Sequence, residues 1–117
     1  MSISQSIRKG EKARLHGYAT LFAALGDETR LSIVAKLSKG QPRSISQLTE
    51  GSKLSRQAVT KHLKVLENVG IVQSMYSGRE NLFELDPRPF KDIREYLGFV
   101  SEQWDQALSR LKSFVDN

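Results

Sequence analysis

Five polar residues between positions 56 and 64 have side chains suited to contacts with nucleic acid: Arg56, Gln57, Thr60, Lys61 and Lys64. Their spacing places them on one face of an α-helix. Arginine can form two hydrogen bonds to guanine and glutamine two to adenine, while lysine mainly contacts phosphate. No acidic residue occurs from position 53 to position 64. The pattern predicts a helix in the major groove of DNA, although the face taken alone also fits a solvent-exposed helix of an ordinary globular domain.

The same segment has an apolar side and recognisable ends. Three aliphatic residues would anchor it on a core: Val59, Leu63 and Leu66. Ser55 can cap its first turn, and Gly70 suits the left-handed residue that follows a helix. A short helix, capped by Ser44 or Ser46, precedes it and ends at Gly51. Residues 44–70 therefore predict a helix-turn-helix motif.

After Gly70 the apolar pattern changes to a period of two, which is typical of strands. Residues 71–86 predict a β-hairpin that turns at positions 77–80. Arg79 at its tip would approach the minor groove or the backbone of DNA. It is the only basic residue from 73 to 85, a stretch that also contains Glu80 and Glu84. The hairpin therefore predicts a weaker DNA contact than a row of arginines would.

A polar, basic arm followed by a helical pattern occupies residues 1–25, and a second helical pattern occupies residues 88–116. Eight apolar residues of the second pattern recur every three or four positions: Phe90, Ile93, Leu97, Val100, Trp104, Leu108, Leu111 and Val115. This stripe would be about 39 Å long at 1.5 Å per residue, more than so small a domain can cover. Part of it should therefore pack on a second chain. The predicted fold is mainly α with a small β-hairpin, a single winged helix-turn-helix domain over residues 1–117.

The composition limits the partners of the chain. Its 117 residues suffice for one domain, and its net charge of +5 and pI of about 9.7 favour an anionic partner such as nucleic acid. It has no cysteine, which excludes disulfides and thiolate metal sites. No stretch is apolar enough for a transmembrane helix or a signal peptide. We therefore expect a cytoplasmic protein with no membrane partner.

The sequence shows no catalytic residues. It contains no glycine-rich phosphate loop and no convincing nucleophile–histidine pair. Ser55 and His62 are separated by about two helical turns, too far for a hydrogen bond. His62 lies near the apolar side of its helix, which favours a structural or phosphate-contacting role over a ligand role. A binding protein is predicted rather than an enzyme.

Three segments resemble the ArsR-type (arsenic-repressor) family of transcriptional regulators: GYATLFAALGDETRLSIVAKL, SISQLTEGSKLSRQAVTKHLKVLENVGIV and YSGRENLFEL. The resemblance covers residues 16–86. It rests on a D-x-T-R run that begins at Asp27, combined with an S-x-x-x-V-x-x-H-L run that begins at Ser55. It implies a homodimeric winged-helix repressor of a palindromic operator, with dimerisation through the N-terminal and C-terminal helices.

Two sets of site residues follow from the pattern and the resemblance together. The residues predicted to contact double-stranded DNA are Ser44, Ser55, Arg56, Gln57, Thr60, Lys61, Lys64 and Arg79. The residues predicted to form the dimer interface are Leu15, Tyr18, Phe22, Leu97, Val100, Trp104, Leu108 and Leu111. A winged-helix module that binds a protein in place of specific DNA is the alternative function.

The chain departs from the founding members of that family at their metal sites. Ser44-Ile45-Ser46 stands where those members have a Cys-Val-Cys motif, and the C-terminal helix has carboxylates but no histidine. Carboxylates alone are poor ligands for zinc or nickel, so neither a metal nor another cofactor is predicted. Two modes of control remain open: a small apolar or aromatic effector in the dimer seam, or control by the abundance of the regulator alone.

Overall fold

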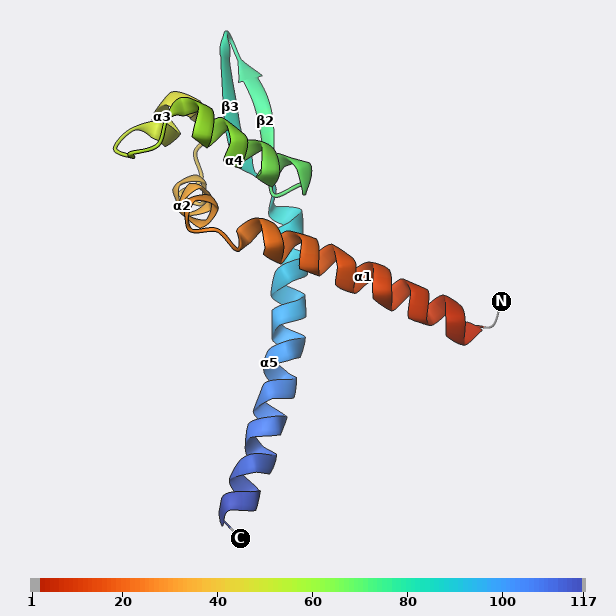
Figure 1. Ribbon diagram of the computed structural model, residues 1–117. Coiled ribbons are helices and arrows are strands. Elements are labelled where there is room, and N and C mark those ends of the chain that lie inside the picture. The colour runs from red at the N-terminus through yellow and green to blue at the C-terminus, as the bar shows by residue number, and fades with distance from the viewer. Residues whose placement is uncertain (1–2, 117) are drawn as a thin grey trace.

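The computed structural model describes the backbone of residues 3–116 and the side chains from Gly10 onward. Along this part of the chain the elements are α1 (Ile3–Leu25), α2 (Glu28–Leu37), β1 (Arg43–Ser44), α3 (Ile45–Thr49), α4 (Arg56–Asn68), β2 (Val72–Ser77), β3 (Glu80–Leu85) and α5 (Pro87–Asp116). The helices α3 and α4 form a helix-turn-helix, and β2 and β3 form the wing (Figure 1). The predicted fold class is confirmed. The predicted single domain also includes residues 1, 2 and 117, which lie outside the described residues, and its extent stays a prediction.

Three helices begin at side chains that cap them. Asp27 accepts a hydrogen bond from the backbone N–H of Arg30 at 3.0 Å, and this bond lowers the pKa of the Asp27 carboxyl. Ser55 caps α4 in the same way, at 3.1 Å. Ser44, rather than Ser46, caps α3 and forms a capping box with Gln47. Each bond satisfies an N–H that the first turn leaves free, so these starting points are set locally.

The sheet has three antiparallel strands in the order β1-β3-β2, one more than the hairpin that the sequence predicts. The additional strand β1 pairs Arg43 with Phe83 and Ser44 with Leu82. Two residues are too few to show the alternation of apolar and polar residues that is typical of a strand, so β1 could not be predicted from the sequence. The wing turns at two residues, where the φ of 64° at Gly78 suits a hairpin turn that begins with glycine.

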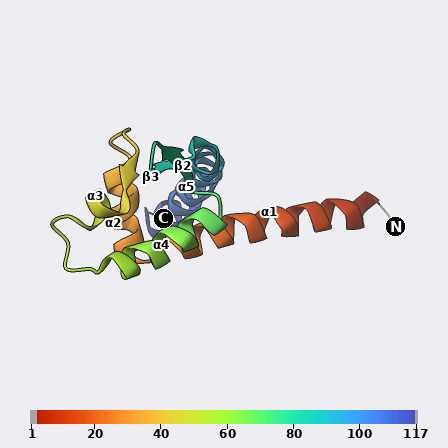
Figure 2. The same ribbon diagram turned by 90° about the horizontal axis from the view of Figure 1, so that it is seen from above.

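The core is small and lies where α2, α3, α4 and the sheet meet. Leu66 and Ile71 are completely buried there, and Leu48, Val59 and Leu63 are each 1% exposed. The long helices α1 and α5 touch this body at one end and project away from it in different directions (Figures 1 and 2). The molecule therefore measures 63 × 45 × 22 Å. Much of the surface of both long helices faces solvent.

Arg30 joins three helices on the side of α4 that lies away from its polar face. Its guanidinium donates hydrogen bonds to the backbone carbonyls of Ala23 and Ala24 at the end of α1. Its Nη1 lies 3.4 Å from Nδ1 of His62 on α4, and the same His62 nitrogen lies 3.8 Å from the carboxylate of Asp27. His62 is therefore half-buried in a structural position. The D-x-T-R run encodes this joint between α1, α2 and α4.

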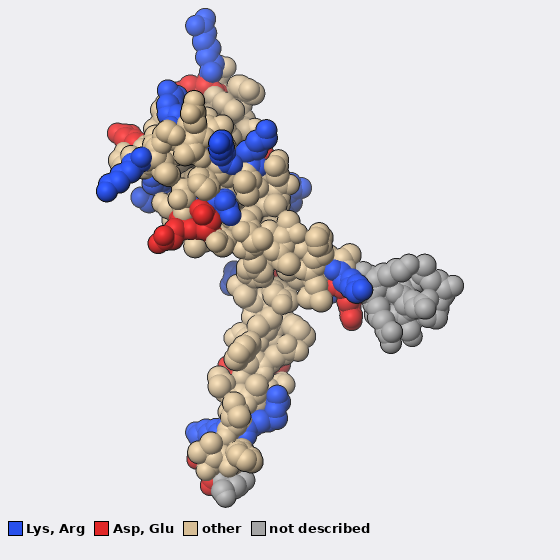
Figure 3. Space-filling model, viewed as in Figure 1, with Lys and Arg blue, Asp and Glu red and all other residues tan. Residues whose placement is uncertain are grey.

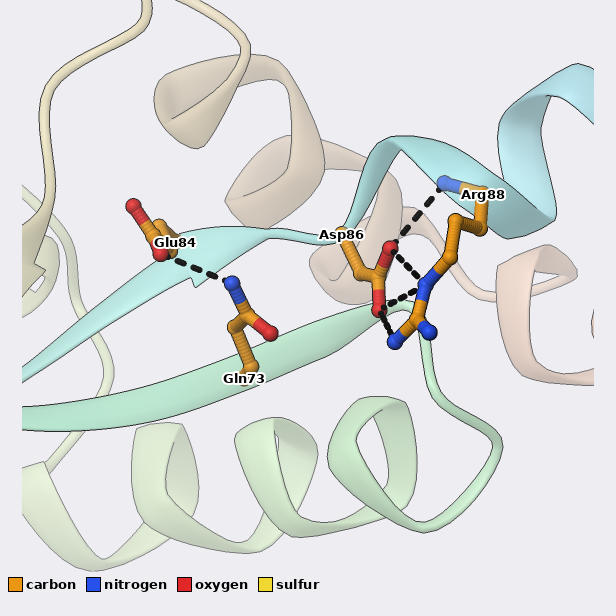
Figure 4. Close-up of polar contacts among 4 residues, drawn as sticks. All are labelled: Gln73, Glu84, Asp86 and Arg88. Atoms are coloured by element: carbon orange, nitrogen blue, oxygen red, sulfur yellow. Dashed lines mark hydrogen bonds and ion pairs between the residues drawn. The ribbon is translucent and has the colours of Figure 1, made fainter.

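Asp86 connects the wing to α5 (Figure 4). Its backbone N–H donates to the carbonyl of Ile71 at 2.9 Å. Its carboxylate accepts hydrogen bonds from the guanidinium of Arg88, the shortest at 2.6 Å, and from the backbone N–H of Arg88 at 3.0 Å. These bonds lower the pKa of Asp86 to about 2. The first N–H groups of a helix have no acceptor within the helix. Among the first three residues of α5 only Arg88 has an N–H, because Pro87 and Pro89 lack one, and Asp86 accepts its hydrogen bond.

Candidate nucleic-acid interface

The polar face of α4, called here the groove face, is open to solvent. All five of its members are exposed: Arg56, Gln57, Thr60, Lys61 and Lys64. Val59, Leu63 and Leu66 on the other side of the helix are buried in the core. The hydroxyl of Thr60 donates to the backbone carbonyl of Arg56 at 2.7 Å. Thr60 therefore presents an acceptor oxygen and a methyl group outward, both of which can meet base edges in a major groove.

Within the described part of the chain, no acidic side chain pairs with the cations of the groove face. One ion pair, Arg88 with Asp86, and one histidine–carboxylate contact, His62 with Asp27, occur among the described residues, and both lie outside this face. The partial positive charge at the start of a helix adds to the potential of these side chains. Figure 3 shows lysine and arginine side chains spread over the globular end of the molecule, with almost none along the middle of α5. This distribution favours contact with an extended anion at the globular end.

The remaining three residues predicted to contact DNA lie at the same end of the molecule. Ser55 is exposed, and because its oxygen accepts the capping bond, its hydroxyl proton stays free to donate. Ser44 is half-buried, and its oxygen accepts the capping bond of α3. Arg79 is exposed at the tip of the wing and takes part in neither of those contacts. Their contacts with DNA stay predictions.

The residues predicted for the dimer interface fall into two groups. Tyr18 and Phe22 of α1 pack within the chain against Tyr96 of α5, with ring centroids 4.4 Å and 6.0 Å away. Val100 is half-buried, whereas the others are open to solvent: Leu15 is 55% exposed, Leu97 48%, Trp104 64%, Leu108 56% and Leu111 61%. The open members on α5, called here the α5 stripe, are Leu97, Trp104, Leu108 and Leu111. The role of both groups between two chains stays a prediction.

A cleft of about 1020 Å³ lies between α1, the end of α4 and the start of α5. Its lining combines Arg14, Asp92 and Glu95 with apolar residues such as Leu21 and Val69. No three potential metal-ligating side chains lie together within residues 10–116. No helix within the described part of the chain is long and apolar enough to cross a membrane.

Comparisons with known proteins agree with this fold. Residues 27–74 match the family model described as "Bacterial regulatory protein, arsR family". The chain is 33% identical over 94 residues to the HTH-type transcriptional regulator Rv2034 of Mycobacterium tuberculosis, covering 80% of this chain and 84% of that protein. The structure of an ArsR-like transcriptional regulator from Rhodococcus sp. RHA1 has a TM-score of 0.72 at 33% identity, with 86% of this chain and 93% of that one covered.

A solved winged helix-turn-helix domain of Mb0332 from Mycobacterium bovis shares the fold, with a TM-score of 0.61 at 20% identity over 86% of this chain and 89% of that one. The fold, the groove face and these matches define a winged helix-turn-helix transcriptional regulator. The chain belongs to the ArsR family of bacterial regulatory proteins. The predicted family and the prediction of a regulator rather than an enzyme are both confirmed.

Sequence reasoning missed two residues near these surfaces. Tyr96 joins the two long helices, and its spacing from Ile93 and Val100 was an available signal, because intervals of three and four residues follow one side of a helix. Arg43 lies in β1 beside the wing. It had no detectable signal, because the strand that positions it was not recognisable from two residues.

Proposed function

We propose that the protein is a homodimeric repressor that binds a palindromic operator with α4 in the major groove. The groove face carries this proposal, because its polar side chains are exposed while the other side of α4 is buried, and its cations pair with no acid among residues 10–116. Arg56 and Gln57 would read base edges, Thr60 would meet bases, and Lys61 and Lys64 would contact phosphates. Ser44, Ser55 and Arg79 would add backbone contacts around them.

The α5 stripe supports a dimer with a second copy of this chain. Its members are 48–64% exposed, and large apolar side chains exposed in a row along one side of a helix suit an interaction site. The 30 residues of α5 extend about 45 Å, so much of the helix runs beyond the body. The related Mycobacterium bovis domain is described as homodimeric. A two-fold axis would place two α4 helices about 34 Å apart, which matches half-sites separated by one turn of DNA.

The place of action and the mode of control complete the proposal. A transcriptional regulator meets its operator in the cytoplasm, where we place the protein. If it takes a small-molecule effector, the cleft beside α1 and α5 is the candidate site, because it touches both long helices and the end of α4. A ligand bound there would change the dimer and the position of α4 together.

Fluorescence anisotropy with DNA from immediately upstream of the protein's own coding sequence tests the proposal. We expect nanomolar affinity that falls steeply with salt, because phosphate contacts release counterions. Arg56→Ala/Lys61→Ala should lose the preference for this DNA over an unrelated duplex. The matched variant Arg110→Ala/Lys112→Ala removes the same charges from the far end of α5 and should keep the preference.

The same titrations separate the two functions that the sequence suggested. If the parent binds both duplexes equally weakly and the groove-face variant changes nothing, α4 is not a recognition helix. A protein-binding winged-helix module would then be the better assignment. If the parent prefers the upstream DNA, transcription from that promoter in vitro distinguishes repression from activation.

A further inference from the structure

Two buried polar atoms of the sheet have no hydrogen-bond partner among the residues that the structure describes: Nε of Arg43 in β1 and Oδ1 of Asn81 in β3. Buried polar atoms in folded proteins are nearly always hydrogen-bonded, and a partly buried cation without a counter-charge is unfavourable. Among the described residues no carboxylate pairs with Arg43. The two atoms therefore mark a place where the described part of the chain supplies no polar partner.

Both residues lie on the face of the sheet that turns towards α4. Arg43 is directly opposite Phe83, and directly opposed residues of antiparallel strands share a face. Asn81 is two residues from Phe83 along β3 and so shares that face as well. Phe83 packs in the core with the buried side of α4, which fixes the direction of the face. Tyr76, opposite Asn81, completes it and is 78% exposed. The side of the sheet that carries Arg43 of the neighbouring strand β1 together with Tyr76 and Asn81 of the wing is called here the inner face of the wing.

The acidic residues of the wing lie on its other face. Glu84 is opposite Gln73, whose amide donates a hydrogen bond to it at 2.8 Å (Figure 4). Glu80 is opposite Ser77 and one residue from Asn81, so it too points away from the inner face. Sequence reasoning counted both glutamates against DNA contact by the hairpin. The register separates them from the inner face, which carries a cation and two neutral polar side chains.

We propose that the inner face of the wing binds a backbone phosphate of the operator, with Arg43 as its charged ligand and Asn81 and Tyr76 as neutral ones. The inference rests on the proposed function, because a phosphate arrives there only when DNA lies along α4 and the wing. Arginine, asparagine and tyrosine all contact phosphates in protein–DNA complexes. A guanidinium can hold a phosphate through two hydrogen bonds, which supplies the missing counter-charge.

The position of Arg43 gives this contact a role in setting the register of α4 on DNA. Arg43 and Asn81 are diagonal neighbours across β1 and β3, within reach of a long side chain. A guanidinium held by phosphate at its terminal nitrogens can turn Nε towards Oδ1 of Asn81, which would satisfy both unpaired atoms. Because β1 leads directly into α3, such a phosphate would be fixed relative to the whole helix-turn-helix.

Salt-dependent titrations with the upstream DNA test the inference on the full-length protein. Each lost phosphate contact lowers the slope of log affinity against log salt by about 0.9, so a dimer of Arg43→Gln should lose about 2 from the slope. Arg43→Lys keeps the charge and should keep the slope, but it should bind more weakly because the fork is lost. Arg110→Gln, the same substitution at the far end of α5, should change neither quantity.

Each outcome decides the question. If folded Arg43→Gln keeps the slope of a parent that prefers the upstream DNA, the inference is wrong while the proposed function stands. A parent without that preference refutes the proposed function itself. If Arg43→Gln does not fold, Tyr76→Phe decides, because Tyr76 is too exposed to be needed for folding. Loss of its hydroxyl should weaken binding several-fold with an unchanged slope, and parental affinity would overturn the inference.

Discussion

Truncation of Leu108 to alanine should weaken the proposed dimer by an amount that follows from the structure. Leu108 lies in the α5 stripe and is 56% exposed in the single chain. Full burial of a leucine side chain is worth about 2 kcal/mol, so covering its exposed part is worth about 1 kcal/mol. In a dimer with two-fold symmetry the leucine of each chain contributes, so the dimer loses about 2 kcal/mol of association free energy. The dissociation constant of the dimer should therefore rise about 30-fold, since 1.4 kcal/mol corresponds to a factor of ten.

Sedimentation velocity over a dilution series measures that constant for the parent and for Leu108→Ala. Gln106 lies on the other side of α5, so Gln106→Ala should leave the dissociation constant of the dimer unchanged. Trp104, at 64% exposure, offers a second readout, because its emission should move to shorter wavelength as the dimer forms. If the parent is dimeric and Leu108→Ala dissociates at the same concentration, the α5 stripe is not the interface. A parent that stays monomeric throughout would refute the dimer itself.

Three further predictions concern stability. Leu66→Ala empties a site that is 0% exposed and should lower the free energy of unfolding in urea by about 2–5 kcal/mol; a loss below about 1 kcal/mol would contradict its central place in the core. Gly70→Ala puts a Cβ at a φ of 83° and should lose about 1–2 kcal/mol and lower the Tm, whereas Gly98→Ala, inside α5 with open space around it, should not lower the Tm. The pKa of Asp86 is about 2 against an ordinary value of 3.8, so its bond to Arg88 stabilises the fold above pH 4 and is lost towards pH 2. Between pH 4 and pH 2 the free energy of unfolding should therefore fall less for Asp86→Asn than for the parent. Parallel plots of that free energy against pH for the two proteins would contradict this role.

Features that depend on neighbouring residues were predictable from the sequence. The cap of α4 joins Ser55 to a backbone N–H three residues away, and the division of α4 into polar and buried sides follows from helical spacing alone. The two-residue period of the wing was equally visible. These signals defined the fold class and the groove face, because local chemistry and tertiary packing favour the same conformation there.

Features that depend on contacts between distant segments were not predictable. Arg30 meets His62 across 32 positions of sequence, and Tyr18 stacks on Tyr96 from the opposite end of the chain. The position of Arg43 depends on the pairing of β1 with β3, which no local pattern specifies. The alternation of Glu80 and Asn81 was present in the sequence. Which of them turns towards α4 could be decided only once Phe83 was known to lie in the core.

The projection of α1 and α5 from a small core has a consequence for the abundance of the regulator in a cell. In the proposed dimer, folding and association share one free energy, so stability rises with the concentration of the protein. Scarce copies would expose Trp104 and Leu111 to chaperones and proteases, whereas abundant copies would protect each other. The steady-state level would then rise more than proportionally with the rate of synthesis. Such a relation would give the promoter a sharper threshold between its free and occupied states than a stable monomer would provide.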